Sequence, residues 1–252
     1  MEYETILNLG AELGRLLLLS GAEIYRAEES VERLLRAYGL TPQVFAIPNC
    51  LIVSITTPQG HPITRMCRIP AHGTDIELLE GCNHLCRSLC QNPVPVNEAM
   101  ALINALPNQT RQATPQRVLF GYTLAASFFC LFFGGTPLDW VCAAITGLSI
   151  GLMTLFGQPL IGSNSFFRTV ICSAMSALIP MLLIPLGIGQ HQDLITIGVL
   201  MLLVPGMALT NAMREIMAGD IISGINRTAE VILIATAIAL GTALPLLIQQ
   251  AL

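Results

Sequence analysis

Hydrophobic residues near the start of the chain recur at helical spacing. Five of them lie on one helical face: Ile6, Leu9, Leu13, Leu16 and Leu17. This spacing predicts an amphipathic first helix. The tetrapeptide that begins at Ser20 and ends at Glu23 has the form of a capping box. It predicts a second helix that runs to about Tyr38, where Gly39 ends it.

The pattern then changes to short β-branched runs separated by turn residues. These runs predict three strands, at Gln43–Ile47, Leu51–Thr57 and Ile63–Ile69. A second capping box at Thr74–Glu77 predicts a helix to about Cys90, and a short helix follows from Asn97 to Leu106. We therefore expect an α/β domain over residues 1–116, with the order α-α-β-β-β-α-α.

Long apolar stretches fill the rest of the chain, residues 117–252. Several contain about 20 mostly apolar residues, which is the length that crosses a bilayer as a helix. They predict an all-α transmembrane bundle of about five helices, with spans at about 118–135, 138–157, 169–187, 194–212 and 221–248. Small residues within these spans, as in Ala143–Gly151, favour close packing between helices.

Charge separates the same two halves. Residues 1–117 carry 11 acidic residues and 9 arginines, whereas residues 118–252 carry 5 acidic residues and 3 arginines. The net charge of −4 gives no reason to expect a nucleic-acid partner. The sparse charge of residues 118–252 predicts that this half of the chain has the lipid bilayer as its partner.

The arginines also predict an orientation. Arg111, Arg117, Arg168, Arg214 and Arg227 flank one set of helix ends, and the alternate loops at 134–139 and 187–193 contain none. By the positive-inside rule, the N-terminal domain is expected in the cytoplasm and the C-terminus outside. The first hydrophobic segment is too short to span a bilayer, and the N-terminus lacks the basic region of a signal peptide. Asp139 and Asp193 are expected at the outer interface.

Cysteine and histidine residues suggest zinc only weakly. Cys82, Cys86 and Cys90 form a stripe along one predicted helix, and a single helix does not wrap its ligands around a tetrahedral ion. His61 and His72 could add ligands from loops, but buried reduced thiols are the favoured interpretation. We expect neither a metal nor a cofactor.

Two segments at opposite ends of the chain resemble the threonine/serine exporter family. The first is Ser20-Gly21-Ala22-Glu23-Ile24-Tyr25-Arg26, followed by Glu28-Glu29 and Arg33. The second is Leu203-Val204-Pro205-Gly206, followed by Asn211, Arg214-Glu215, Gly219-Asp220 and Ser223-Gly224. Glu215 stands where the family pattern leads us to expect an aspartate, and the change keeps the negative charge.

The resemblance implies an exporter of small carboxylate metabolites in the inner membrane, with threonine, serine or a dicarboxylate such as succinate as cargo. Since some members fuse two membrane modules, this chain is similar to the larger subunit of a split exporter. The resemblance then implies a small integral-membrane subunit as partner. Association of several copies of this chain stays open.

A carrier needs a polar site where its helices are broken. The candidate substrate-binding residues are Pro205, Gly206, Asn211, Asn226, Arg227 and Glu230. An arginine suits a carboxylate through its two-pronged donor geometry, although Arg227 could instead lie at the interface and pair with Glu230. Glu23, Tyr25, Arg26 and Glu29 form the motif of the soluble domain, where they could cap a helix, pair with one another or contact the membrane module.

Two other functions remain open at this point. One is a membrane-anchored enzyme of hydrolase type, but the chain carries no nucleophile elbow, phosphate loop or zinc-protease helix. The other is a membrane-anchored metabolite sensor. Transport that depends on the helix break favours the exporter; turnover or ligand binding by the soluble domain favours the alternatives.

Overall fold

The computed structural model describes residues 2–57, 59–70, 73–109, 114–157 and 164–251. Contacts between residues group the chain into two compact units. Unit 1 consists of Met1–Gln112 and Thr210–Thr228, and unit 2 consists of Ala113–Leu209 and Ala229–Leu252. Residues 210–228, which lie in the predicted membrane half, thus make their contacts with the N-terminal residues. The division into a cytoplasmic domain and a membrane domain stays a prediction.

The N-terminal part of unit 1 has the predicted order of elements. These are α1 (Glu2–Leu19), α2 (Ile24–Ala37), β1 (Pro42–Ile47), β2 (Cys50–Thr56), β3 (Pro62–Arg68), α3 (Ile76–Gln91) and α4 (Val96–Gln109). The three strands form one antiparallel sheet in the order β1-β2-β3. Val53 in the central strand lies opposite Val44 on one side and Arg65 on the other.

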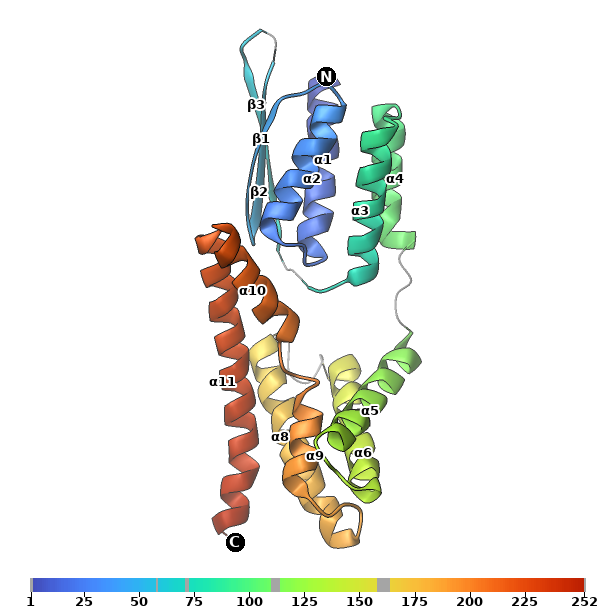
Figure 1. Cartoon of the computed structure of the whole chain (residues 1–252), viewed down its shortest axis with the longest axis vertical. Coiled ribbons are helices and arrows are strands. Elements are labelled where there is room, and N and C mark those ends of the chain that lie inside the picture. The colour runs from blue at the N-terminus through green and yellow to red at the C-terminus, as the bar shows by residue number, and fades with distance from the viewer. Residues whose placement is uncertain (1, 58, 71–72, 110–113, 158–163, 252) are drawn as a thin grey trace. The chain divides into compact units, whose positions relative to one another are not determined.

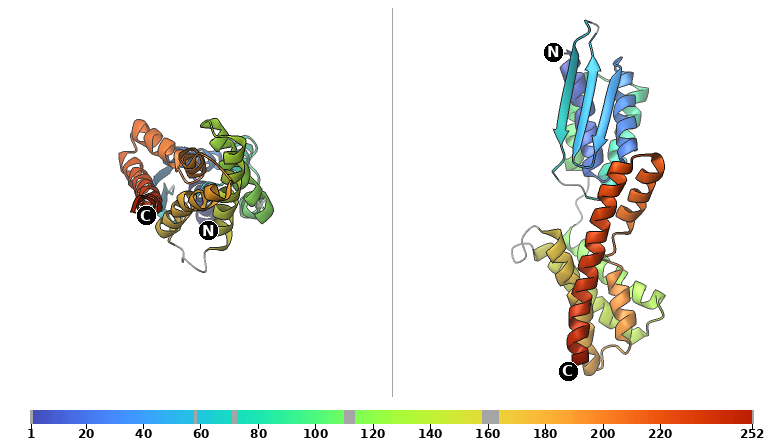
Figure 2. Two further views of the ribbon diagram at one scale, coloured as in Figure 1. Left: turned by 90° about the horizontal axis from the view of Figure 1, so that it is seen from below. Right: turned by 90° about the vertical axis from the view of Figure 1, so that its left-hand side faces the viewer.

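Three layers make up this part of the unit. Figure 1 shows the sheet on one side, α1 and α2 against it, and α3 and α4 beyond them, and the second view in Figure 2 shows the outer face of the sheet. Helix α1 contacts α2, α3, α4, β2 and β3, so leucines on most of its sides are buried. The predicted amphipathic character is confirmed: Glu4, Asn8, Glu12 and Arg15 form one partly exposed polar side, and the predicted apolar residues are buried. Each fully buried leucine contributes about 1.5–3 kcal/mol.

The turn from α1 to α2 differs from the predicted capping box. Gly21 adopts a positive φ of 92°, and the Ala22 N–H donates to the Leu17 carbonyl, a closing turn that ends α1. The Ser20 hydroxyl donates back to the carbonyl of Leu17 at 2.9 Å. Helix α2 therefore starts only after Glu23, whose carboxylate makes no capping bond and is available for other partners. Helix α3 is capped by Asp75, which accepts from the Leu78 N–H, one residue later than predicted.

The second part of unit 1 comes from α10 (Gly206–Ala218) and α11 (Ile221–Ala251). Residues Thr210 to Thr228 include most of α10 and the first turns of α11. Gly224 lies close to α10, because a Cβ atom there would come within 2.4 Å of Ile216. The two helices therefore form a tight hairpin.

Unit 2 is built from apolar helices with small residues at their contacts. It contains α5 (Pro115–Phe132), α6 (Pro137–Phe156), α8 (Ser165–Leu183), a 3-10 turn η1 (Ile184–Leu186), α9 (Gln192–Leu200) and the later part of α11. Helices α5, α6, α8 and α9 pack together around a core that contains Ala126, Cys142, Ala143, Ile150 and Val199. The Ser173 hydroxyl of α8 lies 3.3 Å from the Ala237 carbonyl of α11 and donates to it.

Within the described residues, three helices are long and apolar enough to cross a membrane: Pro137–Phe156, Ser165–Leu186 and Ile221–Gln249. The predicted bundle of about five spans is not confirmed. Helix α5 starts with Pro115, Gln116 and Arg117, which dilute its apolar character. The predicted span 194–212 is interrupted, because α9 ends at Leu200 and α10 starts at Gly206. At 1.5 Å per residue, the nine residues of α9 reach only about 14 Å.

Asp139 is buried within the protein, and its place at the outer membrane interface stays a prediction. It is 0% exposed and lies in the first turn of α6, where Thr136 and Asp139 form a capping box. Its carboxylate also accepts the backbone N–H groups of Gln190 at 2.6 Å and His191 at 2.9 Å. Asp139 thus ties the start of α6 to the segment before α9. Asp193 is exposed.

Candidate functional site

The two family-like segments meet within unit 1. The α1–α2 turn supplies Ala22, Glu23 and Ile24, and the hairpin of α10 and α11 supplies Arg214, Glu215 and Arg227. We call these six residues the motif cluster. About 190 residues separate its two parts along the chain.

Glu215 is the most buried member of the motif cluster. Its side chain is 0% exposed, and its Oε1 atom accepts a long hydrogen bond of 3.4 Å from the backbone N–H of Ile24. The same oxygen lies 3.1 Å from Nε of Arg227. Its other oxygen, Oε2, has no hydrogen-bond partner among the described residues. Burying a carboxylate oxygen without a hydrogen-bond partner costs free energy. This oxygen can therefore still accept a proton or a hydrogen bond.

Arg227 faces Glu215 from the second turn of α11. The residue is 7% exposed, and its Nη2 atom donates to the backbone carbonyl of Ala22 at 3.0 Å. Nε of Arg227 is close enough to Glu215 to form an ion pair, but the two groups are not aligned for a hydrogen bond. Arg227 therefore joins the C-terminal segment to the α1–α2 turn and supplies the positive charge beside Glu215.

Glu23 forms the outer part of the motif cluster. Its Oε1 atom accepts from Nη1 of Arg214 at 2.8 Å, and its Oε2 atom pairs with Nε of Arg26 at 2.8 Å. Glu23 is buried, whereas the side chains of Arg214 and Arg26 are 57% and 62% exposed. Glu23 thus holds two exposed arginines at the edge of the motif cluster.

Burial raises the pKa of two carboxyl groups in this region. For Glu215, burial raises the pKa, and the positive charge of Arg227 and the hydrogen bond from Ile24 oppose the shift. For Glu28, burial also raises the pKa, opposed by the 2.6 Å hydrogen bond that the Ala46 N–H donates to it. Because burial outweighs these opposing contacts, and the negative charge of Asp220 adds a smaller effect, both groups bind a proton more readily than an exposed glutamate.

The four motif residues of the α2 region occupy two settings. Glu23 and Arg26 take part in the buried and outer ion pairs described above. Tyr25 accepts a 3.2 Å hydrogen bond from Arg26 Nε through its hydroxyl, and Glu29 forms an exposed ion pair with Arg33 one helical turn later. Of the roles open to them from the sequence, ion pairing describes Glu23, Arg26 and Glu29, and Glu23 also contacts the C-terminal segment.

The six candidate substrate-binding residues do not share one unit. Asn211, Asn226 and Arg227 belong to unit 1, and Pro205, Gly206 and Glu230 belong to unit 2. Arg227 is buried and committed to Glu215 and Ala22, and Asn226 is exposed. Pro205 stands at the end of the interruption between α9 and α10. Their part in binding a substrate stays a prediction.

The cysteines of α3 are packed thiols. Cys82 and Cys86 are buried, and burial raises the pKa of each thiol to about 12. All eight cysteines of the chain are free. In the parts of the chain that the structure describes, no three histidine, cysteine or acidic side chains are close enough to hold a metal ion, and His72 lies outside those parts.

Sequence reasoning missed the pairing of Glu215 with Arg227 and of Glu23 with Arg214. The available signal was charge: each family-like segment contains both acidic and basic residues within a few positions of one another. Neither hydrophobic periodicity nor spacing indicates that two segments so far apart in the chain meet.

Comparison with known proteins identifies the family of the chain. The profile of the family described as "Putative threonine/serine exporter" matches residues 8–248, a range that includes both segments of the motif cluster. Pheromone-regulated membrane protein 10 of Debaryomyces hansenii is 25% identical over 220 residues, and its counterpart in Pichia sorbitophila is 24% identical over 220 residues. Each alignment covers 82% of this chain and 21% of the yeast protein, so the chain spans about a fifth of the length of these relatives.

No solved structure matches the chain. The family profile, in contrast, extends over nearly all of the sequence and both of its charged segments. The chain is a membrane protein and belongs to the threonine/serine exporter family.

Proposed function

We propose that the chain is a subunit of an inner-membrane exporter of small carboxylate metabolites, and that it works with a small integral-membrane partner. Threonine, serine and a dicarboxylate such as succinate are the candidate cargos. In this proposal unit 1 without its α10–α11 hairpin lies in the cytoplasm, and the C-terminus lies outside. Family membership supports export and argues against an enzyme.

The motif cluster is the observation that carries the proposal. A carrier must couple a binding site to a change of conformation, and buried charge that is only partly satisfied is suited to that task. Glu215 has one oxygen without a partner, and Arg227 beside it has the fork geometry that binds carboxylates. A carboxylate cargo or a proton that reaches this pair changes the balance of charge at the point where α10 and α11 meet the α1–α2 turn.

The orientation rests on the arginines at the helix ends. Arg168 precedes the main part of α8, and Arg214 and Arg227 flank the turn between α10 and α11. The segments 134–139 and 187–193 contain no arginine. This asymmetry supports a cytoplasmic N-terminus under the positive-inside rule.

Efflux from proteoliposomes tests the proposal. Vesicles are loaded separately with labelled threonine, serine and succinate, and contain this chain alone or with its small membrane partner. We expect efflux of one cargo class when both subunits are present, and its loss in Arg227→Ala. Arg68→Gln, which changes an exposed arginine on β3 outside the motif cluster, is the matched control and should retain efflux.

Arg227→Lys separates loss of function from loss of folding, since it keeps the positive charge and removes the fork geometry. If both subunits are inserted and folded and none of the three cargos leaves the vesicles, the carboxylate-export proposal is wrong.

A further inference from the structure

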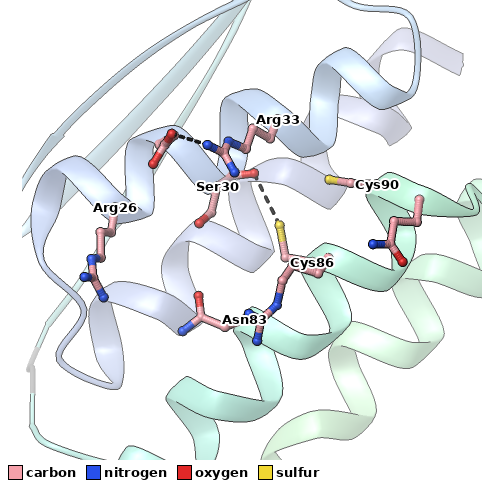
Figure 3. Close-up of a pocket in the computed structure, with 9 residues that line it drawn as sticks. Arg26, Ser30, Arg33, Asn83, Cys86 and Cys90 are labelled. Carbon is pink, nitrogen blue, oxygen red and sulfur yellow. Dashed lines mark hydrogen bonds and ion pairs between the residues drawn. The ribbon is translucent and has the colours of Figure 1, made fainter.

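A groove on unit 1 lies between α2 and α3, apart from the buried Glu215–Arg227 pair. Its cavity volume is about 560 Å³, within the range of about 300–1,000 Å³ that is common for small-molecule sites. Figure 3 shows Arg26, Ser30 and Arg33 on α2 facing Asn83 and Cys86 on α3. Both walls are regular helices, so the groove is a fixed feature of the fold.

Positive charge dominates the lining. Three arginines, Arg26, Arg33 and Arg87, line the groove, and Glu29 is its one acidic residue. Glu29 pairs with Arg33, and Arg26 pairs with Glu23 outside the groove. Arg87 makes no hydrogen bond or ion pair with any residue that the structure describes, and it is exposed. The lining thus carries a net charge of about +2 at neutral pH.

Neutral donors complete the groove. Asn83 and Gln91 offer amide groups beside the arginines. The floor adds no negative charge, because the Cys86 thiol donates to the Ser30 carbonyl at 3.5 Å and stays protonated. The groove therefore offers hydrogen-bond donors and positive charge, with a single acidic group that is already paired.

We propose that this groove binds a small dianion, which carries either two carboxylates or a phosphate group. Arginine forks match both groups, and the volume accommodates a four-carbon diacid or a small phosphate ester. A zwitterionic amino acid fits less well, because its ammonium group would have to compete with Arg33 for Glu29. The site does not depend on the export function and would hold equally for a metabolite sensor.

Hydrogen exchange of the full chain in phosphatidylcholine nanodiscs tests the site. The probes are succinate, inorganic phosphate and threonine, with chloride at matched ionic strength as the reference. We expect succinate, phosphate or both to slow exchange in residues 24–37 and 76–91 in a saturable manner, and threonine to act far more weakly. Arg87→Gln should weaken this binding about tenfold, the loss of one charge-assisted pair.

Two controls match the groove variants. Arg68→Gln removes an exposed arginine of β3 and matches Arg87→Gln, and Arg36→Gln breaks an exposed α2 ion pair and matches Arg33→Gln. Both controls should bind as the unaltered chain does. Protection by succinate alone would identify the ligand as a dicarboxylate, and protection by phosphate alone would identify it as a phosphate compound. Protection by both would show that the site does not distinguish the two.

Two results would overturn the site. One is the absence of protection at saturating succinate and phosphate in a chain that is folded by circular dichroism. The other is protection that survives both Arg87→Gln and Arg33→Gln. Intact binding with no efflux of any cargo would leave the groove in place and remove the exporter proposal, so the two failures are distinguishable.

Discussion

Among the residues whose burial the structure describes, unit 1 and unit 2 each contain one carboxylate that is 0% exposed, and the two are satisfied in opposite ways. In unit 2, both oxygens of Asp139 accept hydrogen bonds, from backbone N–H groups of Thr136, Gln190 and His191 and from the Thr136 hydroxyl. In unit 1, Glu215 has a long hydrogen bond from Ile24, an ion pair with Arg227 and one oxygen without a partner among the described residues.

This difference separates a fully hydrogen-bonded charge from a partly satisfied one. A carboxylate that backbone donors surround on both oxygens is stable as an anion and holds two segments in place. A carboxylate that depends on one arginine and leaves an oxygen bare changes its state when a proton or ligand arrives. Asp139 therefore acts as a fixed brace in unit 2, whereas we propose that Glu215 is a responsive element in unit 1.

Removal of Arg227 should have the largest effect. Arg227→Ala leaves Glu215 buried without its countercharge, which costs about 3–5 kcal/mol of unfolding free energy. Thermal unfolding of the detergent-solubilised chain measures the loss. Arg36→Ala, which breaks an exposed pair with Glu32, is the matched control and should cost less than about 1 kcal/mol.

Replacing both buried partners sharpens this prediction. Glu215→Met combined with Arg227→Met should recover much of the lost stability, because no uncompensated charge remains. If the double variant loses as much unfolding free energy as the two single variants together, the two side chains do not form a pair.

Removal of Asp139 should have the next largest effect. Asp139→Ala strips the acceptor from the N–H groups of Gln190 and His191 and should cost about 2–3 kcal/mol. Hydrogen exchange should quicken at the starts of α6 and α9 and stay unchanged in α1 and α2. Asp193→Ala, at an exposed position in the first turn of α9, is the control and should have little effect. An equal effect of both variants would contradict the bracing role.

Tighter packing of unit 2 gives a smaller effect. A Cβ atom on Gly198 would lie 2.6 Å from the backbone nitrogen of Cys130, so Gly198→Ala forces α9 away from α5. We expect a loss of about 1–3 kcal/mol in thermal unfolding. Gly121→Ala on α5 meets no atom within 4 Å and should be neutral. A neutral Gly198→Ala would mean that α5 and α9 are not in close contact.

The pH dependence of stability gives the smallest effect. Burial raises the pKa of Glu215 above its ordinary value of 4.5, so the folded chain binds this proton more tightly than the unfolded chain. The contribution of Glu215 to stability is therefore greatest below about pH 4.5 and falls as the pH rises through the folded pKa. Glu28 shifts in the same direction for the same reason.

Unfolding temperatures of the unaltered chain and of Glu215→Gln, measured from acidic to neutral pH, isolate this contribution. The glutamine variant should show a shallower fall, with the contribution of Glu28 remaining. Identical slopes would mean that Glu215 titrates as an exposed carboxyl does.

The sequence predicts local structure well where side-chain pattern and turn residues act over a few positions. The three strands and the helices of residues 2–109 follow from alternation, helical spacing and the Gly and Pro residues between them. The predicted start of α2 is wrong by a few residues. Gly21 ends α1 with a left-handed turn, and the Ser20 hydroxyl bonds the Leu17 carbonyl instead of capping α2. Glu23 consequently pairs with Arg214 instead of capping its helix.

The sequence fails where the outcome depends on distant contacts. Pro205 and Gly206 predict the helix break that the structure shows between α9 and α10, but nothing in the sequence indicates that residues from Thr210 onward belong to unit 1. The sequence also does not indicate that Asp139 is buried, which depends on the hydrogen bond from the backbone N–H of Gln190. No local pattern reports either contact, since each depends on where a remote segment lies.

A double-mutant cycle on Glu23 and Arg214 tests most directly whether the two family segments act together. Glu23→Gln, Arg214→Gln and the double variant are compared in nanodiscs for unfolding free energy, and in proteoliposomes for efflux with the partner subunit. Direct contact predicts a coupling energy of about 1 kcal/mol or more and efflux losses that do not add in the double variant. Effects that add to within about 0.5 kcal/mol, with additive losses of efflux, would contradict a motif cluster that joins the two segments.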